Sequence, residues 1–241
     1  MTMTSIDGVI KRRLLINYQL NPDIAETILP HPFRPKTIKG KAIIGVCLIR
    51  LENIRPTLLS SIPVGMSSEN AAHRIAVEWD ENGETKEGVY IFRRDTNSKL
   101  NSLVGGRIFP GTHQLADFQV NDTGNTVEFS MESKDKEVNI SIKGKEHDKL
   151  QPNSVFQSIA EISSFFKSGA NGYSPDKKGE CHQGLCLHTN DWTMTPFKAE
   201  EVKTTYLGDV LNISDHDLEF DSVVLMRNIQ HKWEKLSGIP S

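Results

Sequence analysis

Polar side chains and a tight turn come together in the stretch GGRIFPGTH, which runs from Gly105 to His113. The two glycines allow close backbone approach, and Phe-Pro-Gly is typical of a turn. An arginine such as Arg107 holds a carboxylate or phosphate with its planar fork, and a histidine such as His113 can act as a base or a ligand. The stretch is therefore typical of a site wall. The alternatives are an ion pair of Arg107 with Asp95 and a structural hydrogen bond for His113.

Two further segments carry charged side chains on expected strands. In AAHRIAVEW, His73 and Arg74 are adjacent, so on a strand they face opposite sides and one of them points inwards. In RRD, residues 93–95, Arg94 is a candidate for binding a ligand beside the pocket. The alternative for this segment is an ion-pair network that only stabilises the end of the strand.

Metal chemistry finds little support in the sequence. The segment CHQGLCLH contains four candidate zinc ligands, namely Cys181, His182, Cys186 and His188. Ligands so close together would require the chain to turn very tightly around one zinc ion. LCLH also has a strand pattern, whose alternate residues face opposite sides. P-loop, dinucleotide-binding, G-x-S-x-G and H-E-x-x-H motifs are also absent from the sequence. We therefore expect no metal and no cofactor.

Composition narrows the class of protein. The 241 residues carry a formal net charge of −3, with 37% hydrophobic and 24% charged residues, which is typical of an ordinary globular protein. Without a basic stripe or a long apolar run we expect neither nucleic acid nor membrane as a partner. Three cysteines are too few for a disulfide framework, which favours a reducing, cytoplasmic compartment. No linker divides the chain, so a single domain over residues 1–241 is expected.

Alternation of apolar and polar residues dominates the chain and predicts roughly eight to ten strands. The expected strands lie at 12–19 and 41–54, in a hairpin over 72–94 with its turn at 80–83, in a three-stranded meander over 113–145, and after Gly184. Helices are expected at 21–30, with Asn21 as N-cap, at 154–169, with a Ser154/Gln157 capping box, and over 97–104. The predicted fold is mostly β (α+β), a closed or nearly closed antiparallel β-barrel or cone with two or three peripheral helices.

Three segments together resemble the acetoacetate decarboxylase-like superfamily. They are INYQLNPDIAETILPHPFRPK (16–36), SSENAAHRIAVEW (67–79) and YIFRRDTNSKLNSLVGGRIFPGTH (90–113). Their order and spacing resemble the family's strand, helix and proline opening, its glutamate turn, and its G-R-x-hydrophobic-P turn. The similarity is greatest to an uncharacterised branch known only as a domain of unknown function. There it extends over nearly the whole chain, including GYS at 172–174 and LMRNIQHKW at 225–233.

The resemblance also implies that this chain lacks the family's Schiff-base lysine. Acetoacetate decarboxylase forms a Schiff base through a lysine that follows the proline of this turn. Here Gly111 follows Pro110, and no lysine occurs between Lys99 and Lys134. Schiff-base decarboxylation is therefore not expected of this chain.

Site residues follow from the same resemblance. Glu69 matches the family's active-site glutamate and would transfer a proton, although it could instead cap a turn. Arg107 matches the arginine of the turn. The family's first-strand arginine corresponds to Arg13, with Lys11 and Arg12 as alternative registers.

Two functions remain open from the sequence. One is an enzyme that acts on a small organic acid by acid/base chemistry without a Schiff base, using Glu69 and His113 as catalytic groups. Its ligand, expected to be anionic, would be bound by four side chains, Arg107, Arg13, His73 and Arg94. The other is a non-catalytic protein that binds a small metabolite in the same cavity. The assembly is also left open, with a homo-oligomer as the candidate.

Overall fold

The computed structural model describes residues 5–59, 65–99 and 110–241. The strands are β1 (Ser5–Leu20), β2 (Arg34–Pro35), β3 (Thr37–Ile38), β4 (Lys41–Pro56), β5 (Met66–Glu81), β6 (Glu84–Thr96), β7 (His113–Asp122), β8 (Thr126–Ser133), β9 (Asn139–Glu146), β10 (Asn171–Pro175), β11 (Cys181–His188), β12 (Thr195–Thr204), β13 (Glu219–Lys235) and β14 (Ile239–Pro240). The helical elements are α1 (Pro22–Ile28), α3 (Ile159–Ser168), the 3-10 turn η1 (Thr57–Leu59) and the π-helical turn η2 (Tyr206–Val210).

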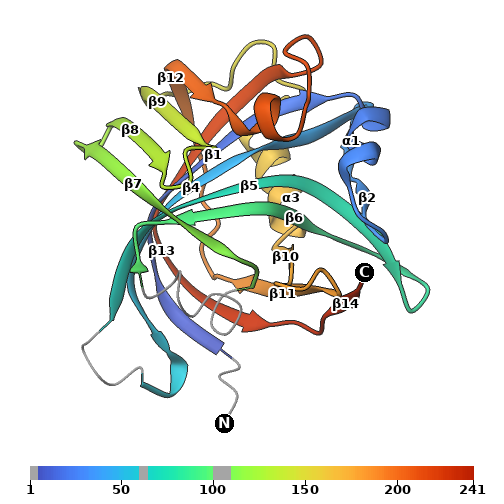
Figure 1. The fold of residues 1–241 in the computed structure, drawn as a ribbon. Helices are drawn as coiled ribbons and strands as arrows, with labels where there is room; N and C mark the ends of the chain where they lie inside the picture. Colours follow the sequence, from blue (N-terminus) through green and yellow to red (C-terminus); the bar gives the residue numbers. More distant parts are fainter. Residues whose placement is uncertain (1–4, 60–64, 100–109) are drawn as a thin grey trace.

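The strands close into rings (Figure 1). In the described part of the chain, nine of them form a large ring in the order β1-β4-β5-β6-β7-β8-β9-β12-β13 and back to β1. A smaller ring leaves β6 through β10 and β11 and rejoins at β13. The two rings share β13, β1, β4, β5 and β6. The predicted mostly β fold, with a nearly closed antiparallel arrangement and peripheral helices, is confirmed; the pairs β6–β7 and β6–β10 are parallel.

The shared strands are buried on both faces, because each ring encloses its own apolar cluster. Leu14 belongs to the cluster inside the large ring and its neighbour Leu15 to the cluster of the smaller ring, as alternation requires. The second cluster also contains Ile162, Phe165 and Phe166 of α3. In Figure 1, α3 lies behind β5 and β6. The five shared strands therefore form a wall between two interiors.

Local signals in the sequence explain several element boundaries. Asn21 caps α1 by accepting a hydrogen bond from the Asp23 backbone N–H at 3.0 Å, as predicted. The β5–β6 turn has positive φ angles at Asn82 (53°) and Gly83 (79°), which suits an Asn-Gly hairpin. None of the helices in the described ranges is long and apolar enough to cross a membrane.

The predicted start of α3 at Ser154 is wrong. The helix begins at Ile159, and its N-cap is Ser158, whose hydroxyl accepts a hydrogen bond from the Glu161 backbone N–H at 3.1 Å. The Ser154 hydroxyl instead donates to the Asp221 carboxylate at 3.0 Å. Ser154 thus contacts β13 instead of capping the helix, and the Ser158-x-x-Glu161 pattern caps it.

Candidate functional site

A cavity of about 110 Å³ lies inside the smaller ring. Each strand of this ring contributes to its wall, and the chain just after α3 completes it. Most of the lining is apolar, with Ile10, Ile49, Ile91, Leu185, Trp192 and Trp233 among its residues. The charged side chains that reach it include Arg13 from β1, Arg74 from β5 and Arg94 from β6. An apolar cavity with a few convergent polar groups is the usual form of a small-molecule site.

Strand register brings the three arginines to one face. Arg13 lies opposite Ile49 of β4, and Arg94 lies opposite Ala72 of β5; both of these partners also line the cavity. The β5–β6 register shifts between His73 and Arg74, so β6 carries one extra residue there. Such a bulge lets residues three apart face the same side, which places Ile91 and Arg94 on the cavity together.

Arg74 is the most deeply buried of the three, with only 2% of its surface exposed. Its Nη2 donates to Asn17 Oδ1 at 2.7 Å, and the guanidinium lies 4.6 Å from the centre of the Phe166 ring. Its Nε and Nη1 have no hydrogen-bond partner among the residues that the structure describes. Burial lowers the pKa of Arg74 to about 10, so that the side chain remains charged at neutral pH.

Arg13 and Arg94 are partly buried and similarly short of partners. Arg13 Nε donates to Cys47 Sγ at 3.2 Å, and its guanidinium lies 5.6 Å from the Trp192 ring centre. Arg94 Nε donates to Ser174 Oγ at 3.3 Å, and burial lowers the pKa of Arg94 to about 10. Within the described ranges, Arg13 Nη1 and the Trp192 indole N–H have no acceptor.

The described cavity lining contains one carboxylate, Asp95, which pairs with Arg93 and not with the three arginines. No ion pair joins Arg13, Arg74 or Arg94 to an Asp or Glu in residues 5–59, 65–99 and 110–241. The remaining residues, 1–4, 60–64 and 100–109, contain no Asp or Glu. Burying a cation without a counter-ion is unfavourable, and unpaired donors around an apolar cavity suit an anion.

His113 and Asp95 stand at the edge of this charge cluster. Burial, reinforced by the positive charge of Arg94, lowers the pKa of His113 to about 3, so its imidazole is neutral at pH 7 and can accept a proton. Asp95 is fully buried, and burial raises its pKa although Arg93 opposes the shift with a bidentate ion pair. The Asp95 carboxylate is thus paired with Arg93, whereas His113 is the imidazole base at the edge of the cavity.

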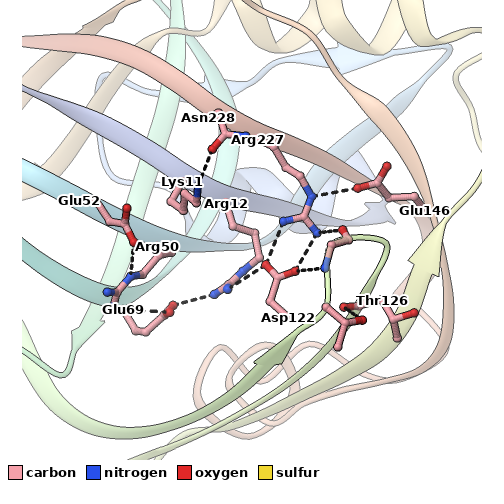
Figure 2. Close-up of polar contacts among 12 residues, drawn as sticks. Lys11, Arg12, Arg50, Glu52, Glu69, Asp122, Thr126, Glu146, Arg227 and Asn228 are labelled. Atoms are coloured by element: carbon pink, nitrogen blue, oxygen red, sulfur yellow. Dashed lines mark hydrogen bonds and ion pairs between the residues drawn. The ribbon is translucent and has the colours of Figure 1, made fainter.

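Glu69 occupies a different environment, in an ion-pair network on the other face of the shared strands (Figure 2). Its Oε2 accepts from Arg12 Nη2 at 2.7 Å, and its Oε1 lies 3.9 Å from Arg50 Nη1. Arg12 also contacts Asp122, which Arg227 holds at 2.9 Å. Burial raises the pKa of Glu69, and the two arginines oppose this rise. Glu69 is not among the residues that line the cavity.

The structure places the remaining predicted residues as follows. His73 faces away from the cavity and stacks on Tyr206, with ring centres 4.3 Å apart; burial lowers its pKa to about 3, and Arg93 acts in the same direction. Arg107 lies outside the described residues. The structure thus brings Arg13, Arg94 and His113 together and separates Glu69 and His73 from them.

Gly111, near the end of the stretch GGRIFPGTH, has a backbone conformation that suits glycine and disfavours lysine. Gly111 has a φ of +77°, and a Cβ atom at this position would lie 2.8 Å from Ser174 Cβ. A lysine here would be strained as well as crowded. Lysine is absent from the described part of the cavity lining, and residues 1–4, 60–64 and 100–109 contain none.

Sequence reasoning did not select Arg74, Cys47 or Trp192 for the site. Alternation allowed either His73 or Arg74 to face inwards, and nothing in the strand pattern decided between them. Cys47 lies in a fully apolar run, IIGVCLI, which gives no indication of the face. Trp192 lies outside the described strands, between β11 and β12, where alternation gives no signal.

The segment CHQGLCLH is strand β11. Phe33 and Tyr90 pack against His182, with ring centres 5.1 and 5.5 Å away, and His188 pairs with Glu234 at 3.2 Å. In the part of the chain that the structure describes, no three His, Cys, Asp or Glu side chains are grouped to hold a metal ion.

The chain belongs to the DUF2071 family, described as an uncharacterized conserved protein, whose pattern it matches over residues 9–216. No curated protein matches the sequence. The fold is acetoacetate decarboxylase-like, as the sequence resemblance predicted.

Solved structures support this fold at low identity. An acetoacetate decarboxylase from Legionella pneumophila is 12% identical with a TM-score of 0.59, and the match covers 97% of this chain and 87% of that one. An acetoacetate decarboxylase-like enzyme from Sphingomonas wittichii is 12% identical with a TM-score of 0.57, covering 100% and 94%. The enduracididine biosynthesis enzyme MppR complexed with pyruvate is 11% identical with a TM-score of 0.53, covering 98% and 89%.

Proposed function

We propose that the protein binds a small organic acid in the arginine-lined cavity and acts on it by acid/base chemistry without a Schiff base. One observation carries the proposal: Arg13, Arg74 and Arg94 line a single apolar cavity and have no carboxylate partner in the described residues. Guanidinium groups bind carboxylates bidentately, and burial strengthens the interaction.

The size of the cavity limits the ligand. Its volume of about 110 Å³ is comparable to that of engineered protein cavities of about 150 Å³ that hold a benzene molecule. A ligand of roughly six non-hydrogen atoms therefore fits. The structurally similar MppR has been captured with pyruvate, an acid of this size.

His113 supplies the acid/base chemistry in this proposal. A carboxylate bound near its ring would raise the pKa of His113 from about 3 towards neutrality, because a negative charge favours the imidazolium. With a 2-oxo acid, the arginines would hold the carboxylate and polarise the neighbouring carbonyl. His113 would then accept a proton from the next carbon, which is an enolisation. No lysine is required.

A non-catalytic binding protein is the second candidate. The observation that favours it is the position of Glu69, which is held by Arg12 and does not line the cavity. The proton-transferring carboxylate that the sequence predicts is then absent from the described lining of the cavity, which leaves His113 as the histidine base there.

Proton exchange distinguishes the two functions. We expect the protein to accelerate deuterium incorporation at the methyl group of pyruvate in D2O, measured by proton NMR, and we expect His113→Gln to abolish the acceleration while pyruvate binding is kept. Binding without exchange would support the non-catalytic alternative. Absence of both binding and deuterium exchange, for pyruvate and for other small carboxylic acids, would contradict the proposal.

A further inference from the structure

Cys47 is the group of the cavity that the proposed function leaves unused. It lies in the middle of β4, is 3% exposed, and forms part of the cavity wall. Arg13 Nε donates a hydrogen bond to its sulfur at 3.2 Å. Cys47 lies opposite Ala72 of β5, which in turn lies opposite Arg94 of β6, and Arg74 lines the same cavity. Its sulfur thus shares the cavity with three cations. Within the described residues, Arg13 and Arg74 have buried donors without partners, and Arg94 contacts the hydroxyl of Ser174.

The other cysteines have different surroundings. Cys181 and Cys186 lie on β11, are partly exposed and do not line the cavity. Cys186 is paired in register with Glu234 of β13; burial raises the pKa of Cys186, and Glu234 adds to this rise. A thiolate is the nucleophilic form of cysteine, and positive neighbours favour it whereas negative ones oppose it. The two β11 cysteines therefore serve as internal references.

We propose that Cys47 is a nucleophile that adds reversibly to the electrophilic carbon of the acid bound by the three arginines; this rests on the proposed function. The ligand class is an oxo acid, in which a carbonyl carbon lies close to the carboxylate. In the addition, Sγ forms a bond to the carbonyl carbon and the π electron pair moves onto the oxygen. That oxygen takes up the proton released by the thiol, so no oxidant or reductant is needed.

Competitive alkylation of the intact protein tests the proposal. Iodoacetate carries the carboxylate that the arginines bind, whereas iodoacetamide has the same shape without the charge. Both form an S–C bond to cysteine and release iodide. Because a focused positive field raises the encounter rate of an anion by about tenfold or more, we expect iodoacetate to modify Cys47 at least about ten times faster than iodoacetamide does. Cys181 and Cys186, quantified in the same digest by mass spectrometry, should show no such preference.

Two variants identify the source of the preference. Arg13→Gln should remove most of it, because the cation that contacts the sulfur is lost. Arg50→Gln removes an arginine from the opposite face of the same strands and should leave the preference unchanged. If Arg13→Gln does not fold, the ratio of the iodoacetate and iodoacetamide rates at Cys47 of the wild-type protein still tests the proposal. A Cys47 that resists both reagents, or reacts faster with iodoacetamide, overturns the proposal.

Protection by pyruvate separates this proposal from the proposed function. Both predict that pyruvate slows alkylation of Cys47 and not of Cys186. If pyruvate binds but Cys47 shows no preference for iodoacetate, the nucleophile is refuted and the binding site stands. A strong preference, with neither pyruvate nor other small acids giving protection, would contradict the organic-acid function and would leave a reactive thiol in a cationic cavity.

Discussion

Two buried arginines, Arg12 and Arg74, show how pairing distinguishes structural from functional charge. Their exposed fractions are 3% and 2%. Arg12 is neutralised by Glu69 at 2.7 Å, whereas the polar contact of Arg74 among the described residues is to the neutral Asn17. A buried charge with a counter-ion contributes to the folded structure, and one without it is kept at an energetic disadvantage. The latter arrangement is typical of a site that binds the missing charge.

Substitution of each arginine by methionine should therefore have opposite consequences. Arg12→Met leaves Glu69 buried without its closest partner and should lower the free energy of unfolding by about 3–5 kcal/mol. Arg74→Met removes an uncompensated charge, so stability should be unchanged or higher while affinity for small acids falls. Urea unfolding of both variants measures the difference. Equal destabilisation by the two substitutions would show that Arg74 is structural.

Buried histidines make the protein sensitive to acid. Burial, with help from Arg93, lowers the folded-state pKa of His73 to about 3, and in the unfolded chain it returns to about 6.5. The unfolded state then binds the proton first, so the contribution of His73 is complete above pH 6.5 and is lost as the pH falls towards 3. Between pH 7 and pH 5 this loss is about 2 kcal/mol.

The variant His73→Phe isolates that contribution, because its ring can still pack on Tyr206. Denaturant unfolding at pH 7 and pH 5 should show that the wild type loses about 2 kcal/mol more than the variant. A pH dependence identical in both proteins would mean that His73 is not held neutral by burial.

Among the helices and strands, the sequence predicted the boundaries that alternation and capping determine. It did not predict the positions that depend on bulges and on contacts between distant elements. Alternation fixed the hairpin of β5 and β6, and Asn21 fixed the start of α1. The face on which Arg94 lies depends on a bulge in β6 that alternation cannot reveal. Ser154, the predicted N-cap of α3, instead contacts Asp221 of β13, and Ser158 caps the helix.

The observed cap of α3 can be tested directly. Ser158→Ala removes the acceptor of the Glu161 backbone N–H and should destabilise the protein by about 1 kcal/mol. Ser164→Ala, an exposed position within the same helix, should be neutral or slightly stabilising, because alanine favours helix. Thermal unfolding compares the two. A neutral Ser158→Ala would place the start of the helix elsewhere.

The whole molecule consists of two strand rings that share one wall, with opposite electrostatic character on its two faces. On the face towards the large ring, charges such as Arg12 and Glu69 neutralise one another (Figure 2). On the face towards the smaller ring, the guanidinium groups have no such partners in the described chain. Because every strand of the smaller ring lines the cavity, an anion bound there would stabilise the closed ring as well as fill it.

Calorimetric titration shows whether this cavity selects a small organic anion. Wild-type protein is titrated with pyruvate and other small carboxylic acids, and with the uncharged amide of each. We predict that at least one acid binds with one site per chain, that its amide does not bind, and that Arg74→Met abolishes binding while Arg50→Gln retains it. Failure of every acid to bind, or equal binding of an acid and its amide, would contradict the claim.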